Sequence, residues 1–386
     1  MTSIAIINRS FWPQSDAIGE ALLLLAELLA QNNYKVQIIT QLSKTDKKEL
    51  TNRIKSSQKN ITLFRLPAIT TSASRIIFRI LELILFSLYV VVLLFWKRPS
   101  KVYVATNPPI VIPYIVRLYC FLFQKKYVYH LQDIHPEAAQ VITGKTHYVY
   151  SALKNIDIKT IIKADKIITL TSQMKHYIRK RTDDQISECN IILLNNPSVV
   201  SPTIPHTNTF EKNIIFCGNA GRLQRIPLLL NSIQKYIQAG GKLPFIFAGG
   251  GIFSKKIEEL AMQYNQITYL GILSGTDAAK IMDKSLYGLM PIEDEVTNFA
   301  FPSKSSSYIY SKCPIIAICS KDTSVAEFVL ENNLGYVVEP EMDKIVSLFF
   351  ELENKNDAKL QVKESFLMTL TPLHHAQQLM KIILDL

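Results

Sequence analysis

The sequence has little charge and few cysteines. Only 19% of its 386 residues are charged, whereas 48% are hydrophobic. The five cysteines are odd in number and form no CxxC pair, and His374 and His375 have no acidic or cysteine neighbour at metal-ligand spacing. These absences argue against a disulfide framework and against a zinc site. They favour buried thiols in a reducing compartment.

Two signals that would point elsewhere are also missing. No GxGxxG follows the first apolar run, residues 3–8, which weakens a nicotinamide-dinucleotide interpretation. No signal peptide is visible, because Met1 leads directly into that run. What the chain does have is an excess of basic residues, 43 against 32 acidic ones, for a net charge of +11. This excess favours a partner that carries phosphates: nucleic acid, an anionic membrane or a phosphorylated ligand.

Strands and helices alternate along the chain. In the first half, apolar runs at 3–8, 36–40, 101–105 and 127–131 predict strands, and residues 17–31 predict an amphipathic helix. The second half repeats the pattern, with strands predicted at 214–217, 245–248, 267–270, 286–290, 315–318 and 335–338. The fold class is therefore α/β, with two Rossmann-like, doubly wound parallel sheets and a cleft between the domains.

Composition also predicts where the domains end. The segment 193–210 is rich in Pro, Asn, Ser and Thr, which is typical of a linker. We therefore expect an N-terminal domain over 1–195, a linker over 196–210 and a C-terminal domain over 211–370. A last helix, 371–386, is expected to pack back on the N-terminal domain.

The chain is organised around residues 214–222, IIFCGNAGR. A buried strand, a glycine turn and a helix beginning at Arg222 would form an anion site, because free N–H groups and the positive end of the helix point the same way. The alternative is an ordinary strand-to-helix turn. Further glycines follow the next two predicted strands. Together the candidate residues of this turn region are Gly218, Asn219, Gly221, Arg222, Gly249, Gly250, Gly251 and Gly271.

Two further residues of the second half join this candidate site. Lys304 stands at the predicted start of a helix with Ser303 as its cap, a position that is unfavourable for a cation unless an anion lies there. Lys304 and Arg222 would then hold one diphosphate. Glu327, on a short predicted helix over 322–330, would accept hydrogen bonds from ribose hydroxyls.

The best acid/base candidates of the first half follow the strand at 127–131. Asp133, His135 and Glu137 bring two carboxylates and an imidazole to one strand end. The alternative is that Asp133 caps the next turn and that Glu137 follows Pro136 at a helix start; for Asp133 we favour function. Gly19 and Asn107 lie in the loops expected to line the same edge.

The most unusual stretch is 75–126. Residues 83–96 are uncharged, but 14 residues fall short of the roughly 20 that a spanning helix needs. The stretch carries eight basic residues and one acid, Glu82. It therefore fits a surface that lies on an anionic membrane without crossing it; the alternative is buried elements of the sheet. Because the positive charge gathers among apolar residues, nucleic acid is not expected as a partner. The membrane candidates are Phe86, Leu93, Phe95, Trp96, Lys97, Arg98, Lys125 and Lys126.

Taken in order, these motifs resemble a known family. The loop FWPQ with Gly19, TNPP at 106–109, DIHPE at 133–137, LLNNP at 193–197, GNAGR, AGGG, FPSK and the segment 325–340 cover nearly the whole chain. The sequence resembles bacterial family-4 glycosyltransferases of the two-Rossmann-domain (GT-B) architecture, in the branch that serves O-antigen and capsule synthesis.

The resemblance implies a retaining, metal-independent transfer from a nucleotide sugar, usually UDP-linked, with no further cofactor. It implies that Arg222 and Lys304 stabilise the leaving diphosphate, and that Asp133 and the loops at Gly19 and Asn107 face the acceptor. The acceptor in this branch is a polyprenyl-diphosphate saccharide. The expected location is therefore cytoplasmic, at the inner face of the cytoplasmic membrane.

The sequence departs from the family pattern at several positions. The usual paired glutamates would fall at Phe299 and Ser307, and Pro227 stands near the place of a helical lysine, with Arg225 close by. Two alternatives therefore stay open. One is a nucleotide-sugar 2-epimerase of the same fold, and the other is an inactive homologue that binds nucleotide sugars.

Overall fold

The computed structural model describes residues 2–13, 17–57, 60–70, 75–143, 148–199, 210–356 and 358–386. The chain divides into two compact units. The N-terminal unit comprises Met1–Asn196 and Pro372–Leu386, and the C-terminal unit comprises Pro197–Thr371. Of the predicted linker over 196–210, residues 200–209 lie outside the described residues.

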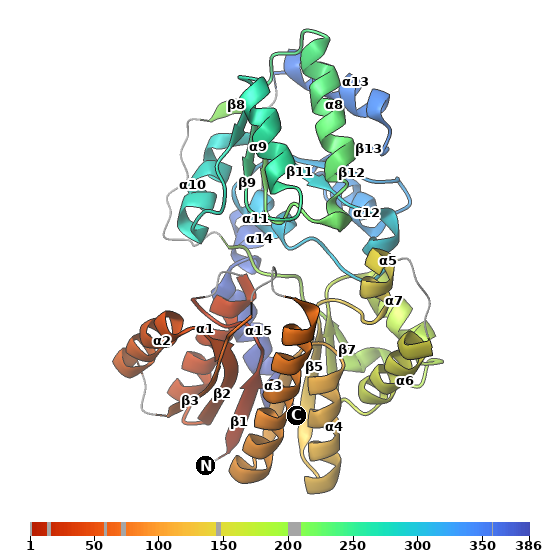
Figure 1. Ribbon diagram of the computed structural model, residues 1–386. Coiled ribbons are helices and arrows are strands. Elements are labelled where there is room, and N and C mark those ends of the chain that lie inside the picture. The colour runs from red at the N-terminus through yellow and green to blue at the C-terminus, as the bar shows by residue number, and fades with distance from the viewer. Residues whose placement is uncertain are drawn as a thin grey trace. The chain divides into compact units, whose positions relative to one another are not determined.

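The N-terminal unit is built on a seven-stranded parallel sheet in the order β3-β2-β1-β4-β5-β6-β7 (Figure 1). Short apolar runs form its inner strands because both faces of the sheet are covered by helices. The strands are β1 (Ser3–Ile7), β2 (Lys35–Leu42), β3 (Ile61–Pro67), β4 (Lys101–Ala105), β5 (Lys126–Leu131), β6 (Lys166–Thr169) and β7 (Ile191–Leu193). The helices are α1 (Ala17–Gln31), α2 (Lys44–Ser57), α3 (Ile76–Lys97), α4 (Val111–Phe123), α5 (Glu137–Thr143), α6 (Tyr148–Ile162), α7 (Ser172–Arg181), the 3₁₀ turn η1 (Glu188–Asn190) and α15 (Pro372–Leu384).

The C-terminal unit has a six-stranded parallel sheet in the order β10-β9-β8-β11-β12-β13. Two α/β units on parallel sheets confirm the predicted fold class. The strands are β8 (Glu211–Cys217), β9 (Phe245–Ala248), β10 (Ile267–Tyr269), β11 (Ser285–Pro291), β12 (Ile315–Ile318) and β13 (Gly335–Val338). The helices are α8 (Ile226–Gln238), α9 (Ser254–Gln263), α10 (Gly275–Lys284), α11 (Lys304–Tyr310), α12 (Ser324–Glu331), α13 (Met342–Asn354), α14 (Glu364–Thr369) and the 3₁₀ turns η2 (Arg222–Gln224) and η3 (Asp294–Asn298).

The last helix, α15, belongs to the N-terminal unit. Its apolar residues Leu379 and Ile383 join the core that α1 contributes through Leu22 and Leu29. Lys101 on β4 donates hydrogen bonds of 3.0 Å to the carbonyls of Ile383 and Leu384. A lysine at this position satisfies carbonyls that the end of a helix leaves unpaired. The final residues of the chain thus complete a core that the first ones begin.

Helix α3 is longer than the sequence predicted. It spans 22 residues instead of a 14-residue apolar run, and by length and composition it is able to cross a membrane. One stripe of this helix, which includes Phe86, Val90 and Leu93, is buried in the N-terminal unit. Phe86 and Leu93 were therefore wrongly predicted as membrane contacts, because they face the protein. Phe95 and Trp96 are exposed, as are Arg98 and Lys126, whereas Lys97 and Lys125 are half-buried.

The acid of α3, Glu82, ties the helix to the sheet. Its buried carboxylate pairs with Arg9 after β1 at 2.7 Å and accepts hydrogen bonds from the Ile69 N–H at 2.6 Å and from Thr70 after β3. Burial alone would raise the pKa of Glu82, but these donors and the Arg9 charge outweigh it and leave the pKa lower than usual. Glu82, whose charge ended the apolar run in the sequence, thus lies buried and holds α3 against the segments that follow β1 and β3.

Candidate functional site

The glycine turns of the C-terminal unit meet at one edge of its sheet. Because β8, β9 and β10 are parallel neighbours, their carboxyl ends lie side by side (Figure 1). Gly218 N–H donates to Ala248 O at 2.9 Å, and Gly249 N–H donates to Gly271 O at 2.7 Å. Ala220 N–H donates to Gly250 O at 2.7 Å. The structure therefore brings together the glycine turns that the sequence singled out.

Close backbone packing explains why two of these positions are glycine. Gly249 has φ +126°, and a Cβ atom there would lie 2.0 Å from the carbonyl oxygen of Gly218. Gly251 has φ +143°, and its Cβ would lie 2.4 Å from the carbonyl oxygen of Ala220. A side chain does not fit at either position, so the loops can approach one another this closely only because both residues are glycine.

Replacing Gly249 with alanine is expected to destabilise the protein by about 2–4 kcal/mol, because the substitution combines backbone strain with a clash against the Gly218 carbonyl. Gly271→Ala is a matched control, since Gly271 also has a positive φ, +66°, but no atom lies within 4 Å of its Cβ position. The control is expected to cost about 1 kcal/mol. Urea denaturation measures both values, and equal costs would contradict the packing role of Gly249.

Lys304 lies beside the first turn of this edge. Its Cε and Nζ lie 3.5 and 3.7 Å from the Cβ position at Gly218, and Nζ stands 3.8 Å from the centre of the Phe216 ring. The ammonium nitrogen is buried and has no hydrogen-bond partner among the described residues. Burial lowers the pKa of Lys304 to about 7, and the neighbouring Cys217 thiol opposes that shift. A buried cation without a counterion marks a place for an anion.

The sequence predicted that Arg222 begins the amphipathic helix, and this prediction is wrong. Arg222 begins the 3₁₀ turn η2, is exposed, and makes no hydrogen bond or ion pair with any residue that the structure describes. The helix α8 begins at Ile226, with Pro227 in its first turn, where proline is favoured. Arg222 thus stands next to the glycine turn as an unpaired cation.

A neighbouring cluster of charges was missed by the sequence analysis. Arg225, which adopts φ +42°, donates to Ile292 O at 2.7 Å and pairs with Glu293 at 3.3 Å and Asp294 at 2.9 Å. Asp294 also accepts hydrogen bonds from Ser320 N–H at 3.0 Å and Ser320 Oγ at 2.6 Å. Burial raises the pKa of Glu293, and Arg225 opposes the shift. The cluster fixes the ends of β11 and β12; the signal for it was two carboxylates directly after a strand.

Other predicted donor-side residues take different places. Glu327 is exposed in the first turn of α12. Ser303 does not cap α11 through its side chain, in contrast to the prediction. Ser307, at one position of the family's paired glutamates, is buried and accepts a hydrogen bond from Val199 N–H at 3.1 Å. Asn219 is exposed, and its side chain lies beside Gly221 and Gly251.

In the N-terminal unit, loops after three strands meet. Gln132 N–H, next to Asp133 after β5, donates to Thr106 Oγ1 after β4 at 3.3 Å. Asn107 Nδ2 donates to Ser10 Oγ at 3.0 Å, and Asn107 O accepts from the Arg9 N–H at 2.7 Å. The predicted candidates Asp133 and Asn107 therefore lie at the carboxyl edge of this sheet.

Burial sets the charge of the acid and base in this loop. It raises the pKa of Asp133 to about 6 and lowers the pKa of His135 to about 4. No ion pair to Asp133 is present within the described part of the chain. At neutral pH Asp133 is thus mainly a carboxylate that accepts a proton readily, and His135 is neutral.

Two residues predicted near the acceptor serve the fold instead. Glu137 is buried and pairs with Arg181 and Lys154, each at 3.3 Å, and accepts a hydrogen bond from Tyr177 at 2.9 Å. These contacts all go to Oε1 and hold Glu137 in the fold, so its predicted role in binding the acceptor gains no support; its buried Oε2 has no hydrogen-bond partner among the described residues. Gly19 lies buried inside α1 and not in the preceding loop, because the helix begins at Ala17.

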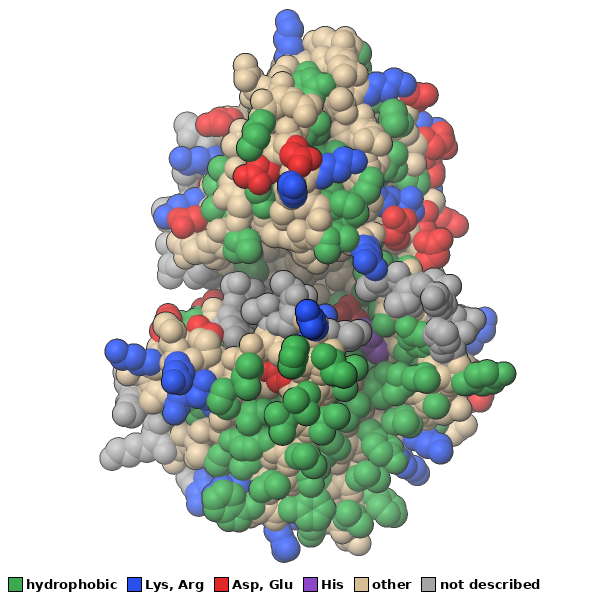
Figure 2. All heavy atoms as spheres, viewed as in Figure 1, with side chains coloured by type: hydrophobic (Ala, Val, Ile, Leu, Met, Phe, Trp, Pro, Cys, Tyr) green, Lys and Arg blue, Asp and Glu red, His purple; other side chains and the backbone are tan. Residues whose placement is uncertain are grey.

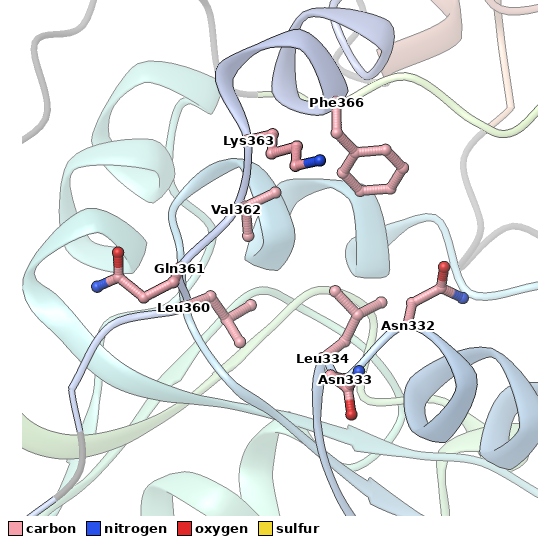
Figure 3. Close-up of a pocket in the computed structure, with 8 residues that line it drawn as sticks. All are labelled: Asn332, Asn333, Leu334, Leu360, Gln361, Val362, Lys363 and Phe366. Carbon is pink, nitrogen blue, oxygen red and sulfur yellow. The ribbon is translucent and has the colours of Figure 1, made fainter.

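A pocket of about 390 Å³ in the C-terminal unit contains none of the predicted site residues (Figure 3). Its lining comes from the segment between α12 and β13, with Asn332 and Leu334, from the segment before α14, with Lys363, and from α14 itself, with Phe366. Residues 332–334 precede β13, so this pocket lies at the amino edge of the sheet. Parallel α/β sheets bind ligands at the opposite, carboxyl edge.

No group of three or more His, Cys, Asp or Glu side chains placed to hold a metal ion occurs within the described ranges. The ligand-binding potential of the carboxyl edges therefore rests on Lys304 and Arg222 in one unit and on Asp133 in the other.

Comparison with known proteins supplies a relative in sequence. No protein-family model matches the chain. A protein of Pseudomonas aeruginosa named "Probable glycosyltransferase WbjE" is 23% identical over 257 residues. The match covers 63% of each protein, so the chain spans less than two thirds of that relative's length.

Solved structures match the chain over its whole length. The apo form of the lipopolysaccharide outer core galactosyltransferase WaaB superposes with a TM-score of 0.60 at 14% identity, covering 100% of this chain and 99% of WaaB. This is the GT-B fold. S. aureus MnaA in complex with UDP has a TM-score of 0.60 at 12% identity, covering 98% of this chain and 95% of MnaA. The UDP-GlcNAc 2-epimerase of Methanocaldococcus jannaschii has a TM-score of 0.57 at 12% identity, covering 99% and 100%. A GT-B fold thus serves both transferases and epimerases, and the site must decide between them.

Proposed function

We propose that this GT-B protein is a family-4, retaining glycosyltransferase that moves a sugar from a UDP-linked donor to a polyprenyl-diphosphate-linked saccharide. The observation that carries the proposal is the buried ammonium of Lys304, unpartnered and held beside the turn at Gly218. In this proposal the ligand's diphosphate lies against the backbone of the glycine turns, which carry no side chains, and Arg222 adds a second cation.

This arrangement suits the chemistry of the donor. Transfer breaks the bond between the sugar's anomeric carbon and a phosphate oxygen, and the electron pair leaves with the diphosphate. Negative charge therefore develops on that oxygen in the transition state. Fixed cations such as Lys304 and Arg222 stabilise this charge more than the ground state, which lowers the barrier.

The relatives support the same reaction class. WbjE carries the name of a glycosyltransferase, WaaB is named as a galactosyltransferase, and MnaA was solved with UDP. The sequence's resemblance to the O-antigen and capsule branch extends the proposal to that pathway. A polyprenyl-diphosphate acceptor resides in a membrane, so we place the reaction at the cytoplasmic face.

A 2-epimerase remains the second candidate, because the M. jannaschii enzyme has the same fold. A homologue that binds nucleotide sugar without turnover is the third, because Ser307 and Phe299 replace the family's glutamates. One experiment separates the three. The protein is first melted with UDP, GDP, dTDP, CDP-sugar and NAD, since a ligand of the native state raises the melting temperature. The stabilising sugar nucleotide is then incubated with and without a polyprenyl-diphosphate saccharide. Transfer only with acceptor supports the proposal; an epimerised sugar nucleotide without acceptor, or binding without any turnover, supports the others.

Asp133→Asn is expected to lower the rate of transfer by about 10²–10⁴-fold while leaving stabilisation by UDP unchanged, because we assign this carboxylate to the acceptor hydroxyl. In the wild type, kcat/KM should fall as the pH drops through about 6, where Asp133 takes up a proton. A pH profile of both proteins tests this. An Asp133→Asn variant with wild-type rates would remove Asp133 from the mechanism.

A further inference from the structure

The helices α3 and α4 present a large apolar face to solvent. Fourteen of the 27 exposed large hydrophobic residues in the described part of the chain lie on these two helices, ten on α3 and four on α4. Figure 2 shows the hydrophobic side chains gathered over this part of the N-terminal unit. We call it the α3–α4 face; it includes Ile84, Leu88, Val92 and Trp96 on α3, and Phe121 and Leu122 on α4.

Helix α3 is apolar on both of its sides. Phe86, Val90 and Leu94 form a buried stripe at a spacing of four residues, and this stripe packs into the protein. Ile84, Leu88 and Val92 form a second stripe at the same spacing, and they are 50%, 59% and 60% exposed. A surface helix of a soluble domain has polar residues on its outer side, so the second stripe indicates a covering partner.

Basic residues stand at both ends of α3, with Arg75 before the helix and Lys97 and Arg98 at its end. Lys97 Nζ lies 3.7 Å from the Trp96 ring centre, and the Arg98 guanidinium carbon lies 5.0 Å from that of Phe123. The acid within residues 75–126, Glu82, is buried and paired with Arg9. Aromatic and basic side chains together are typical of the boundary between lipid headgroups and acyl chains.

The positive charge around the α3–α4 face distinguishes between two candidate partners, a second copy of the chain and an anionic lipid surface. A second copy of the chain would bring its own basic rim against this one, and such like charges oppose association across a two-fold interface. An anionic lipid surface offers the opposite charge and an apolar interior. We propose that the α3–α4 face docks into one leaflet of an anionic lipid bilayer, with α3 lying along the leaflet and not crossing it.

Packing decides against a spanning helix. At 1.5 Å per residue, the 22 residues of α3 extend about 33 Å, enough for the hydrocarbon core. To span it, however, α3 would have to withdraw Phe86 and Val90 from the core and take Glu82 away from Arg9. A carboxylate placed in hydrocarbon is costly, so only the exposed stripe of α3 should enter the lipid. This proposal does not depend on the reaction, and its test needs no substrate.

The first test is flotation of the 386-residue chain with vesicles of phosphatidylcholine, with or without phosphatidylglycerol. Binding to the anionic vesicles is expected, and Leu88→Glu with Phe121→Glu should weaken it at least tenfold. Ile272→Glu with Met262→Glu is the matched control, because both residues are at least as exposed as Leu88 and Phe121 but lie in the C-terminal unit. Lys97→Gln should weaken binding about fivefold, and only to anionic vesicles. Thermal melts confirm that all variants fold. Equal binding of the two double variants would overturn the proposal, as would a wild-type dimer that Leu88→Glu dissociates in the absence of lipid.

The second test distinguishes an embedded helix from a spanning one. Arg75→Cys and Lys97→Cys place a thiol at either end of α3, in a Cys189→Ser background because Cys189 is the exposed native cysteine among the described residues. A membrane-impermeant maleimide added outside sealed vesicles is expected to label both positions. Labelling of one end only after detergent is added would show that α3 spans the bilayer.

Discussion

Replacing Lys304 with glutamine is expected to lower kcat/KM for sugar transfer by about 10²–10³-fold, because it removes a preorganised cation from the leaving diphosphate. Stabilisation by UDP should be weaker in the same variant but still measurable, because Arg222 and the backbone turns remain. Lys284→Gln serves as a control, since Lys284 is an exposed lysine at the end of α10 in the same unit. Transfer at the wild-type rate by Lys304→Gln would remove this lysine from the site.

The same lysine should oppose stability when no ligand is bound. Its pKa is lowered from 10.5 to about 7, so protonation of Lys304 disfavours the folded state, and stability from this group increases as the pH rises above 7. The Phe216 ring offsets only part of the cost. Lys304→Met is therefore expected to raise the melting temperature of the ligand-free protein at neutral pH by roughly 2–4 °C, about 1 kcal/mol. Calorimetry at pH 7 and pH 9 tests this, because the gain should shrink at the higher pH.

UDP binding should respond to pH through the same group. As the pH rises above about 7, Lys304 loses its charge in the free protein, and the affinity for a diphosphate should fall. Bound diphosphate favours the charged form, so binding takes up a proton near neutrality. Titration calorimetry in two buffers of different ionisation enthalpy measures that proton, and Lys304→Gln should abolish the uptake.

Replacing Arg181 with alanine is expected to have the largest effect on folding, a loss of about 3–5 kcal/mol. The Arg181 side chain is fully buried on α7, pairs with Asp157 at 2.9 Å and Glu137 at 3.3 Å, and donates to His135 O at 3.0 Å. Its removal leaves the buried Asp157 without its cation and Glu137 with Lys154 alone. Arg179→Ala on the same helix is the control, since Arg179 pairs with Asp184 and Glu188 at the surface and should cost below about 1 kcal/mol.

The Arg181→Ala defect should depend on pH. Burial already raises the pKa of Asp157 to about 6, and Arg181 opposes that shift. Without Arg181, Asp157 is charged and has lost its ion pair at pH 8, whereas at pH 5 it is protonated. The loss should therefore be greatest at high pH and partly recovered at pH 5. Urea denaturation at the two pH values checks this, and a loss that is independent of pH would show that packing, not charge, holds this region together.

The strands could be predicted from the sequence because their cause is local. Apolar runs bounded by turn residues occur at 245–248 and 315–318, where β9 and β12 are found. The length of α3 could not be predicted in this way, because Glu82 is compensated by Arg9, 73 residues earlier. The start of α8 was predictable but was placed too early: Pro227 is a local signal for a first helical turn, and it marks Ile226 and not Arg222.

For the site, position relative to the strand ends was the most informative signal. It identified Asp133 and the turn at Gly218, because parallel strands bring their carboxyl ends to one edge. Applied to β11, the same rule would have found Glu293 and Asp294. No local sequence pattern reveals which charged side chains pair with one another in the fold. Glu137 resembles a reactive carboxylate in sequence, and only the fold shows that Arg181, Lys154 and Tyr177 all contact its Oε1.

The packing of α15 on α1 also sets the order in which the protein can mature on the ribosome. Residues 197–371 separate the two parts of the N-terminal unit. At about 5–20 residues per second, translation of these 175 residues takes roughly 10–35 s. During that interval the core around Leu22 and Leu29 of α1 lacks the part that Leu379 and Ile383 supply. Until the last helix emerges, the nascent N-terminal unit therefore exposes the apolar surface of α1 that α15 covers in the folded protein.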